Sequence, residues 1–377
     1  MRETVIGIIG CGVISEAYLK GAGRSDLLRV KAVADLRMEA AQARAAEYGC
    51  AALSVDDLLA DPEIEIVLNL TVPVAHAPVD LRILAAGKHI YSEKPLVARF
   101  AEAREVLQAA TARGLRVGCA PDTFLGAGHQ ACRRAVDEGR IGQVIGGAAC
   151  VASRGMERWH PNPEFFFKPG GGPVLDLGPY YITQLVNLLG PVSRVAAEAT
   201  RGYPTRTVGS GPLSGSSIEV EVQTTVNGTL LFASGANLSI TTSWDTWKTR
   251  RPPIEIYGTG GSLQNPDPNF FGGEPMLTRE DGEWEPLPIG AHPFGINNRV
   301  TRLGKEVADY RIIGLLDMAA ALQTGRPHRA SAEMALHVLE VLDALERSAA
   351  EGRHIHVESR CERPEALPTG TGEEVFR

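Results

Sequence analysis

The sequence predicts an α/β fold with an open parallel sheet, followed by an α+β fold with a mainly antiparallel sheet. Over residues 4–121, short β-branched runs alternate with helical stretches. Strands that alternate with helices form right-handed crossovers, which place helices on both faces of a parallel sheet. After residue 121 the strand-like runs alternate apolar and polar residues, as in IEVEVQTTV, which is typical of antiparallel sheets. We therefore expect two domains, at 1–121 and 122–377.

The first domain contains five strand-like runs: VIGIIG, RVKAVAD, IEIVLNL, KHIYSE and LRVGCA. Helices are expected after the first two runs and at about 75–86 and 100–113. Gly87 and Gly114 lie just past the last two helices, where a C-terminal cap favours a residue that tolerates positive φ. The order of these elements predicts a doubly wound sheet.

The second domain begins with a different texture. In the segment 217–234, Asn227 and Gly228 lie between two apolar-alternating runs, which predicts a hairpin turn at this dipeptide. Residues 201–216 are rich in Gly, Ser, Pro and Thr and are expected to form a surface loop. Helices are expected near 127–139, 318–322 and 332–350, and strands at VIGGAACVAS, RVAAEAT and PIEIYG.

Composition excludes several classes of protein. The net charge of −7, from 38 basic and 45 acidic residues, argues against nucleic acid or a membrane surface as the main partner. The six cysteines form no CxxC pair and no zinc-ligand spacing, so we expect reduced thiols and no metal site. We see no signal peptide and no apolar run of membrane-spanning length. We therefore expect a soluble, cytoplasmic protein that binds a small molecule.

The first strand leads into a glycine-rich turn, GCGVIS. Gly10 and Gly12 occupy the first two positions of a GxGxxG pattern, and Ser15 occupies the third. The first glycine permits a tight turn, and the second lets the backbone approach a pyrophosphate at the helix N-terminus. Val13 and Ile14 lie between them and the helix. This context predicts a dinucleotide site.

An acidic residue, Asp35, ends the second strand, 25 residues after Gly10. At this place a carboxylate accepts hydrogen bonds from the adenine-ribose hydroxyls and repels a 2′-phosphate. Asp35 therefore favours NAD, and NADP is less favoured, although Arg37 offers partial compensation. The alternative is that Asp35 caps the next helix.

The run SEKPLV follows the strand HIY, at the edge of the sheet where open α/β proteins bind ligands. Pro95 disfavours a helical conformation of Lys94, so we expect the Lys94 side chain to project into the crevice. A cis bond before Pro95 is a further expectation. The alternative is a turn in which Glu93 and Lys94 are two solvated charges.

A glycine run precedes an amphipathic segment that carries Asp176 and Tyr180. These residues are four apart, so a helix places them on one face, near the N-terminal end that favours a carboxylate. They are candidate catalytic residues. The alternative is that Tyr180 is a core aromatic residue and Asp176 a helix cap.

Taken together, these motifs resemble the Gfo/Idh/MocA family of NAD(P)-dependent oxidoreductases. The resemblance extends over nearly the whole chain, through AGKHIYSEKP, GGGxxxDxGxY, EIYGTGGSL and GRPHRAS, with Thr71, Pro73 and His76 in a TxPxxH pattern. It implies a Rossmann domain followed by an open-faced sheet. It also implies that Thr71, Pro73, His76, Glu93 and Lys94 line the cofactor site.

Two departures refine the resemblance. Tyr180 stands where the family usually has His, and Thr183 where it has a final acid. The chain is therefore closer to the glucose-fructose oxidoreductase and dihydrodiol dehydrogenase branch. Asp122, in CAPDTF, stands where many relatives have an Asn and an Arg, which favours a neutral polyol substrate.

The residue roles follow from what alcohol oxidation requires, a base within hydrogen-bond reach of the hydroxyl. Lys94 or Tyr180 is expected to be that base, and Asp176 to orient it. Further along the chain, RWHPNPEFFF contains aromatic and amide groups that suit a sugar ring; its candidate residues, together with Asp122, are Trp159, His160 and Asn162. The alternative for this run is a loop packed by its own aromatics.

We therefore expect an NAD-dependent oxidoreductase that transfers a hydride between nicotinamide and a secondary alcohol or ketone of a sugar, sugar derivative or cyclitol. One alternative is a lyase or glycosidase that uses tightly bound NAD for transient oxidation. Another is a non-catalytic dinucleotide sensor. Because an antiparallel sheet with few helices leaves one face to be covered, we also expect a homodimer or homotetramer.

Overall fold

The computed structural model describes residues 1–280, 282–301 and 304–376. The chain divides into two compact units, each with its own sheet. Unit 1 comprises Met1–Gly126, Ala291–Leu336 and Pro364–Arg377, and unit 2 comprises Ala127–Gly290 and His337–Arg363.

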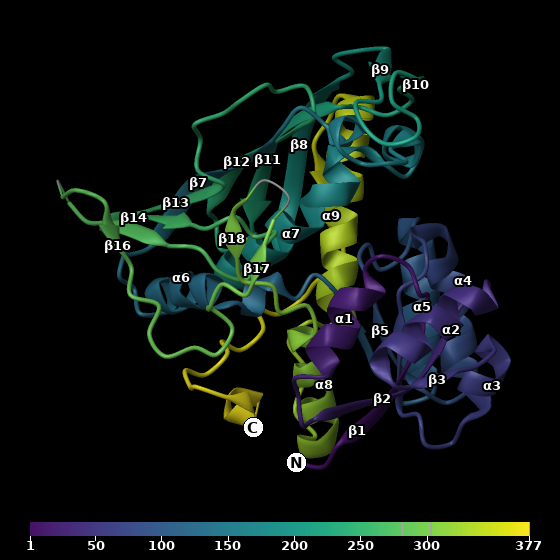
Figure 1. The fold of residues 1–377 in the computed structure, drawn as a ribbon. Helices are drawn as coiled ribbons and strands as arrows, with labels where there is room; N and C mark the ends of the chain where they lie inside the picture. The colour runs from purple at the N-terminus through teal and green to yellow at the C-terminus, as the bar shows by residue number, and fades with distance from the viewer. Residues whose placement is uncertain (281, 302–303, 377) are drawn as a thin grey trace. The chain divides into compact units, whose positions relative to one another are not determined.

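Unit 1 contains a six-stranded parallel sheet in the order β3-β2-β1-β4-β5-β6 (Figure 1). Nearly every residue of β1 and β4 is buried, because helices cover both faces. This confirms the predicted parallel fold. Its strands are β1 Thr4–Ile9, β2 Leu28–Ala34, β3 Ala51–Ala52, β4 Ile66–Asn69, β5 His89–Ser92 and β6 Val117–Cys119, and its connecting helices are α1 Ser15–Ala22, α2 Met38–Tyr48, α3 Val55–Ala60, α4 Pro73–Ala85 and α5 Phe100–Ala112.

The strand order reverses between β1 and β4, and at such a point the connections leave the sheet in opposite directions. The crevice that results lies at the carboxyl ends of the strands. The glycine turn follows β1, Thr71 follows β4, and Glu93 follows β5. The topology therefore gathers the predicted cofactor residues at one edge of unit 1.

The chain returns to unit 1 after residue 290, which the predicted boundary at 121 did not include. Helix α8 (Ile313–Thr324) packs near β6. Beyond it, the Cys119 amide donates to the Ala330 carbonyl at 3.0 Å, and Gly118 forms an antiparallel bridge with Ser331. This segment covers the β6 edge. Residues 291–336 and those from 364 on therefore belong with the first sheet, although the sequence placed them in the second domain. Smaller elements here are β17 Arg299–Val300, β18 Glu306–Val307 and η4 Glu373–Phe376.

Unit 2 is built on a nine-stranded sheet in the order β16-β15-β14-β13-β7-β12-β11-β8-β19. Strands β7 and β12 run parallel, and the other described pairs are antiparallel, as predicted. The strands are β7 Val144–Ala152, β8 Val192–Thr200, β11 Thr225–Phe232, β12 Asn237–Ser243, β13 Ile254–Gly258, β14 Gly261–Asn265, β15 Met276–Thr278, β16 Glu285–Pro286 and β19 Ile355–His356.

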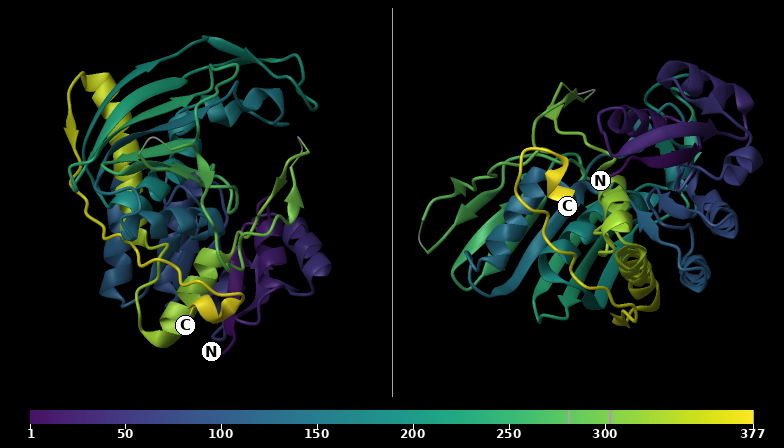
Figure 2. Two further views of the ribbon diagram at one scale, coloured as in Figure 1. Left: turned by 90° about the vertical axis from the view of Figure 1, so that its left-hand side faces the viewer. Right: turned by 90° about the horizontal axis from the view of Figure 1, so that it is seen from below.

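Two helices pack against the central strands of this sheet, α7 (Gly172–Leu189) and α9 (Ala332–Glu351). Gly178 of α7 lies against Leu342 of α9, and the Ser348 hydroxyl of α9 accepts from the Ala197 amide of β8 at 2.9 Å. Figure 2 shows this sheet from two further sides, with α9 along it. Helix α6 (Ala127–Asp137) packs against α7 and β14.

The prediction of a hairpin turn at Asn227 and Gly228 is wrong, because both residues lie inside β11. The chain turns instead at 233–236, where the Phe232 amide donates to the Ala236 carbonyl. A Cβ atom on Gly228 would lie 2.5 Å from Leu345 Cδ2 of α9. The glycine therefore permits close approach of a helix to the sheet, which is the other common role of glycine in a strand.

The surface loop predicted at 201–216 contains a strand. Strand β9 (Thr205–Thr207) pairs with β10 (Ser217–Glu219). Arg206, at the centre of β9, is buried. The β9–β10 hairpin contacts η2 (Met156–Arg158) and η3 (Glu164–Phe167), so it is packed against the chain that follows β7.

Candidate functional site

In the glycine turn of unit 1, Gly10 is tightly packed and Gly12 is open. Gly10 has a φ of +104°, and a Cβ there would lie 2.6 Å from the Leu70 carbonyl. Gly12 has no atom within 4 Å of its Cβ position. The Ser15 hydroxyl donates to the Gly12 carbonyl at 2.6 Å. The turn is thus fixed from within, and the backbone beside Gly12 is accessible to a pyrophosphate.

Asp35 is held beside this turn by two backbone hydrogen bonds. Its Oδ2 accepts from the Cys11 amide at 2.8 Å, and its Oδ1 accepts from the Arg37 amide at 2.9 Å. The residue that caps α2 is Arg37, so Asp35 does not have the helix-capping position of the alternative interpretation. Each carboxylate oxygen retains a lone pair, as binding to ribose hydroxyls requires.

Four apolar side chains are strongly exposed near the carboxyl ends of β1, β2 and β4. They are Val13, Leu36, Val72 and Val74, with exposed fractions of 91%, 98%, 63% and 77%. Exposed apolar groups that gather at a ligand-binding edge gain stability when a ligand covers them. The glycine turn, the fixed carboxylate and these apolar residues together fit a bound dinucleotide.

Thr71 and His76 of the TxPxxH pattern form hydrogen bonds within unit 1. Pro73 is the first residue of α4, and the Thr71 hydroxyl donates to Asn69 Oδ1 at 2.7 Å. His76 is 1% exposed, with Nδ1 2.7 Å from the Pro95 carbonyl and Nε2 3.0 Å from the Thr71 carbonyl. His76 therefore links the β4 turn to the turn after β5 and positions both, rather than presenting its ring to solvent.

The turn after β5 is anchored by Glu93, which is buried. Its Oε1 accepts from the Tyr18 hydroxyl at 2.7 Å, and its Oε2 accepts from the Lys94 amide at 2.9 Å. Burial raises the pKa of Tyr18 well above its ordinary value, so this phenol stays protonated and donates. The bond between Lys94 and Pro95 is cis. The alternative of two solvated charges is wrong for Glu93, which fixes the backbone of the half-buried Lys94.

Asp122, predicted to contact substrate, is buried within unit 1. Its Oδ2 accepts from the Gly314 amide at the start of α8, at 2.9 Å. Burial raises its pKa to about 6. The side chain attaches the returning segment to the first sheet, which the sequence did not indicate.

In unit 2, Asp176 and Tyr180 lie on α7 as predicted. The residue that caps this helix is Gly171, so Asp176 is not its cap. Asp176 is half-buried, whereas Tyr180 is 4% exposed and packs like the core aromatic residue of the alternative interpretation.

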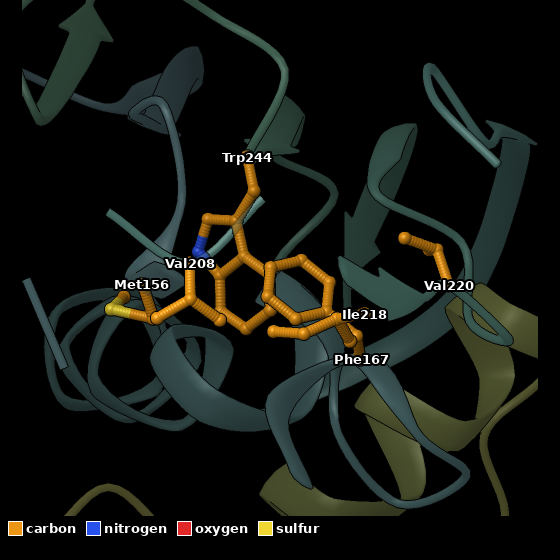
Figure 3. Close-up of a cluster of buried hydrophobic side chains, with 6 residues drawn as sticks. All are labelled: Met156, Phe167, Val208, Ile218, Val220 and Trp244. Atoms are coloured by element: carbon orange, nitrogen blue, oxygen red, sulfur yellow. The ribbon is translucent and has the colours of Figure 1, made fainter. Parts of the chain in front are cut away.

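The aromatic run after β7 has both exposed and buried side chains. Trp159 and Phe165 are 50% and 55% exposed, and the His160 ring lies 5.6 Å from each of their ring centres. The Asn162 side chain is exposed. Phe167 is fully buried in a hydrophobic cluster, shown in Figure 3, whose members are Met156, Phe167, Val208, Ile218, Val220 and Trp244.

A buried ion pair beside this cluster was not predicted. Arg206 Nη1 lies 3.0 Å from Glu157 Oε1, and Nη2 bonds Asp245 Oδ1. These residues come from β9, η2 and the turn after β12. They are far apart in the sequence, so no local pattern indicated their pairing. Among the described residues, no cluster of His, Cys, Asp or Glu could hold a metal ion, and no helix has the length and apolarity to cross a membrane.

Comparison with known proteins identifies the family. Residues 4–120 match the family described as an oxidoreductase family with an NAD-binding Rossmann fold, and residues 129–264 match the GFO/IDH/MocA C-terminal domain. The chain belongs to the Gfo/Idh/MocA family. This confirms the resemblance seen in the motifs, and with it an NAD(P)-dependent oxidoreductase whose first unit binds the dinucleotide.

Relatives within the Gfo/Idh/MocA family include two reductases of sugar derivatives. The dTDP-3,4-didehydro-2,6-dideoxy-alpha-D-glucose 3-reductase of Streptomyces violaceoruber is 32% identical over 270 residues, 70% of this chain and 72% of that one. The 1,5-anhydro-D-fructose reductase of Ensifer adhaerens is 29% identical over 265 residues, 68% and 74% of the two chains. An NAD binding oxidoreductase from Klebsiella pneumoniae shares the fold, with a TM-score of 0.81 at 24% identity over 95% of this chain and 100% of that one.

Proposed function

We propose that this protein is an NAD-dependent dehydrogenase or reductase that interconverts a secondary alcohol and a ketone of a sugar, sugar derivative or cyclitol. The observation that carries the cofactor assignment is the Asp35 carboxylate, fixed by two backbone amides beside the accessible Gly12 turn. When bound, the dinucleotide supplies the acceptor or donor of two electrons. The names of the relatives support a sugar-derived substrate.

We propose that Lys94, Asp176 and Tyr180 are the catalytic residues. Proton transfer is assigned to Lys94 or Tyr180, and Asp176 orients that group. Glu93 supports this assignment, since its hydrogen bond to the Lys94 amide fixes the Lys94 backbone directly after β5. Trp159, His160 and Asn162 are proposed to contact the sugar.

The experiment is a panel of sugars, cyclitols and keto-sugars, followed by the absorbance of reduced nicotinamide with NAD and NADP. A dehydrogenase or reductase changes the amount of reduced cofactor in proportion to product. A lyase or glycosidase that oxidises its substrate transiently forms product without net change in the cofactor. Binding of NAD without turnover of any member of the panel, or of its elimination products, would contradict the proposal.

A further inference from the structure

Unit 2 contains a row of alternating arginine and aromatic side chains, which we call the arginine–aromatic stack. The Arg154 guanidinium carbon lies 4.3 Å from the Trp247 ring centre and 4.5 Å from the Tyr203 ring centre. The Arg206 guanidinium carbon lies 4.8 Å from Tyr203 and 5.7 Å from Phe167. Each of these distances is within the range of a cation–π contact. The stack therefore runs from the buried Phe167 to the exposed Trp247.

At the inner end of the stack, the guanidinium is paired with acidic side chains. Arg206 pairs with Glu157 and Asp245, and Asp245 Oδ2 also accepts from the Thr224 and Thr225 hydroxyls at 2.7 Å each. Two carboxylates surround the one guanidinium, so this end has a net charge of −1. It therefore offers no unpaired positive charge to an anionic ligand.

The outer end differs in charge. Arg154 has no carboxylate within ion-pair distance in the described part of the chain, and its Nη1 is buried without a hydrogen-bond partner. A guanidinium held by contacts with two rings is pre-organised to bind an anion. Trp247, which covers one face of Arg154, is 69% exposed. The outer end thus presents an unpaired cation beside an open aromatic face.

Further cations lie near Trp247 in space or in the sequence, although the protein as a whole carries a net charge of −7. The Arg158 guanidinium carbon lies 5.8 Å from the Trp247 ring centre. Lys248, Arg250 and Arg251 follow Trp247 in the chain and are exposed. None of these four forms an ion pair with the residues that the structure describes. A local excess of positive charge attracts anionic ligands.

The stack lies at the same end of the unit 2 sheet as the start of α7. Strands β7 and β12 are parallel neighbours, with Ala152 opposite Ser243, and Arg154 and Trp247 come from the turns that follow them. The chain before α7 folds against the turn after β12, because the Phe166 and Phe167 ring centres lie 5.9 Å and 5.5 Å from the Trp244 ring centre. Asp176 is in the second turn of α7. The proposed reacting group and the stack are therefore built on one end of unit 2.

We propose that the outer end of the stack binds the anionic part of the substrate, a phosphate or carboxylate carried by the sugar. This inference rests on the proposed function and names its substrate class. Arg154 and the cations around Trp247 bind the anion, and the open face of Trp247 packs against the ring attached to it. The expectation of a neutral substrate relied on Asp122, and that side chain is buried against α8.

The test measures binding and turnover separately. Uridine diphosphate, glucose 6-phosphate, glucuronate and glucose are titrated into the protein, with tryptophan fluorescence and calorimetry as readouts, in the presence of saturating NAD. We expect at least one anionic probe to bind at least 10-fold more tightly than glucose, with affinity that falls as salt rises. Preference for the phosphates or for glucuronate identifies the anion.

The variants are Arg154→Gln, Trp247→Leu and Arg250→Gln. Loss of a charge-assisted contact at Arg154 is expected to weaken the preferred probe about 10- to 100-fold, and the exposed Arg250 is expected to have an effect of about 2- to 3-fold. Arg279→Gln is the matched control, since it removes an exposed cation beside β15, three strands away from β7 in the sheet. Thermal unfolding of each variant monitors folding.

The outcomes separate the two proposals. Tight binding of an anionic probe that Arg154→Gln and Trp247→Leu abolish supports the stack even if no member of the panel turns over. Equal binding of glucose and all anionic probes, or equal losses in Arg279→Gln and Arg154→Gln, overturns the stack proposal while leaving sugar turnover intact.

Discussion

The polar groups around Lys94 in unit 1 and those at the outer end of the arginine–aromatic stack in unit 2 are held in different ways. In unit 1, Glu93 accepts hydrogen bonds at both carboxylate oxygens, and His76 has a carbonyl oxygen beside each ring nitrogen. In unit 2, Arg154 is held by two aromatic rings and retains a buried nitrogen without a partner. Glu93 and His76 thus have partners within unit 1, whereas Arg154 retains a donor for the proposed ligand.

This difference matches the two roles that we propose: catalysis for the region around Lys94, and substrate recognition for the outer end of the stack. A catalytic group must be positioned before the substrate arrives, and buried hydrogen bonds achieve this for the backbone of Lys94, the proposed catalytic residue. A substrate-recognition surface instead needs donors and aromatic faces that the protein leaves available, as we propose for Arg154 and Trp247.

The largest expected effect is on turnover, in Lys94→Ala. Positioned acid or base catalysis contributes roughly 10²- to 10⁴-fold, so turnover is expected to fall by that factor, with the dissociation constant of NAD unchanged within several-fold. Stopped-flow or steady-state absorbance of reduced nicotinamide measures the first, and calorimetry the second. Tyr180→Phe is the comparison: a smaller loss than in Lys94→Ala assigns the proton transfer to Lys94, and a larger loss assigns it to Tyr180. Near-normal turnover in Lys94→Ala would remove this residue from the mechanism.

The inner end of the stack gives the next largest effect, on stability. Arg206→Met leaves Glu157 and Asp245 without their guanidinium, and removing one partner of a buried ion pair typically costs about 3–5 kcal/mol. Urea unfolding measures the free energy. Arg201→Gln, an exposed neighbour on the same chain segment, is expected to change it by less than about 0.5 kcal/mol. If both variants are equally stable, the ion pairs of Arg206 with Glu157 and Asp245 do not stabilise the protein.

Helix α4 of unit 1 contains a buried carboxyl group, Asp80, whose ionisation disfavours the folded state. Asp80 accepts from Asn69 Nδ2 at 2.8 Å, and burial raises its pKa from 3.8 to about 7. Since the folded pKa is above the unfolded value, the folded state holds its proton more tightly. The contribution of Asp80 to stability is therefore fully present below about pH 4 and is lost as pH rises through about 7, by at most about 4 kcal/mol.

Asp80→Asn tests this pH dependence, because an amide does not titrate. We expect the difference in unfolding free energy between the variant and the natural protein to shift in favour of the variant as pH rises from 4 to 7.5. Urea unfolding at several pH values measures it. A difference that is independent of pH would show that Asp80 titrates normally in the folded protein.

At the cofactor turn the expected effect is on affinity. We expect the natural protein to prefer NAD, and Asp35→Ser to bind NAD about 10-fold more weakly, since charge-assisted hydrogen bonds contribute about 1.5–3 kcal/mol. The same change removes repulsion of a 2′-phosphate, so NADP affinity should rise. Calorimetry with both dinucleotides decides it. Equal or tighter binding of NADP by the natural protein would show that Arg37 outweighs Asp35.

The sequence predicted the parts of the fold that local patterns encode. The parallel sheet and the turn at Gly10 follow from short motifs and backbone preferences. The stack could not be predicted, because Arg154, Tyr203 and Trp247 are separated by more than 40 residues and meet only through the sheet. Asp122 was misplaced for the same reason, since its partner Gly314 is 192 residues away.

The smallest expected effect concerns Gly228. It tests whether the glycine is required by a local turn or by the packing of α9 against β11. If Gly228 is in β11 to admit α9, then Gly228→Val drives a side chain into Leu345, and overpacking of this kind costs about 1–3 kcal/mol. The double variant with Leu345→Ala makes room for that side chain, so the two changes should destabilise the protein by less than the sum of their separate effects. A turn glycine behaves differently, because valine at positive φ is strained whatever α9 presents. Additive losses in urea unfolding would therefore contradict the observed packing of Gly228 against α9 and favour a turn at this position.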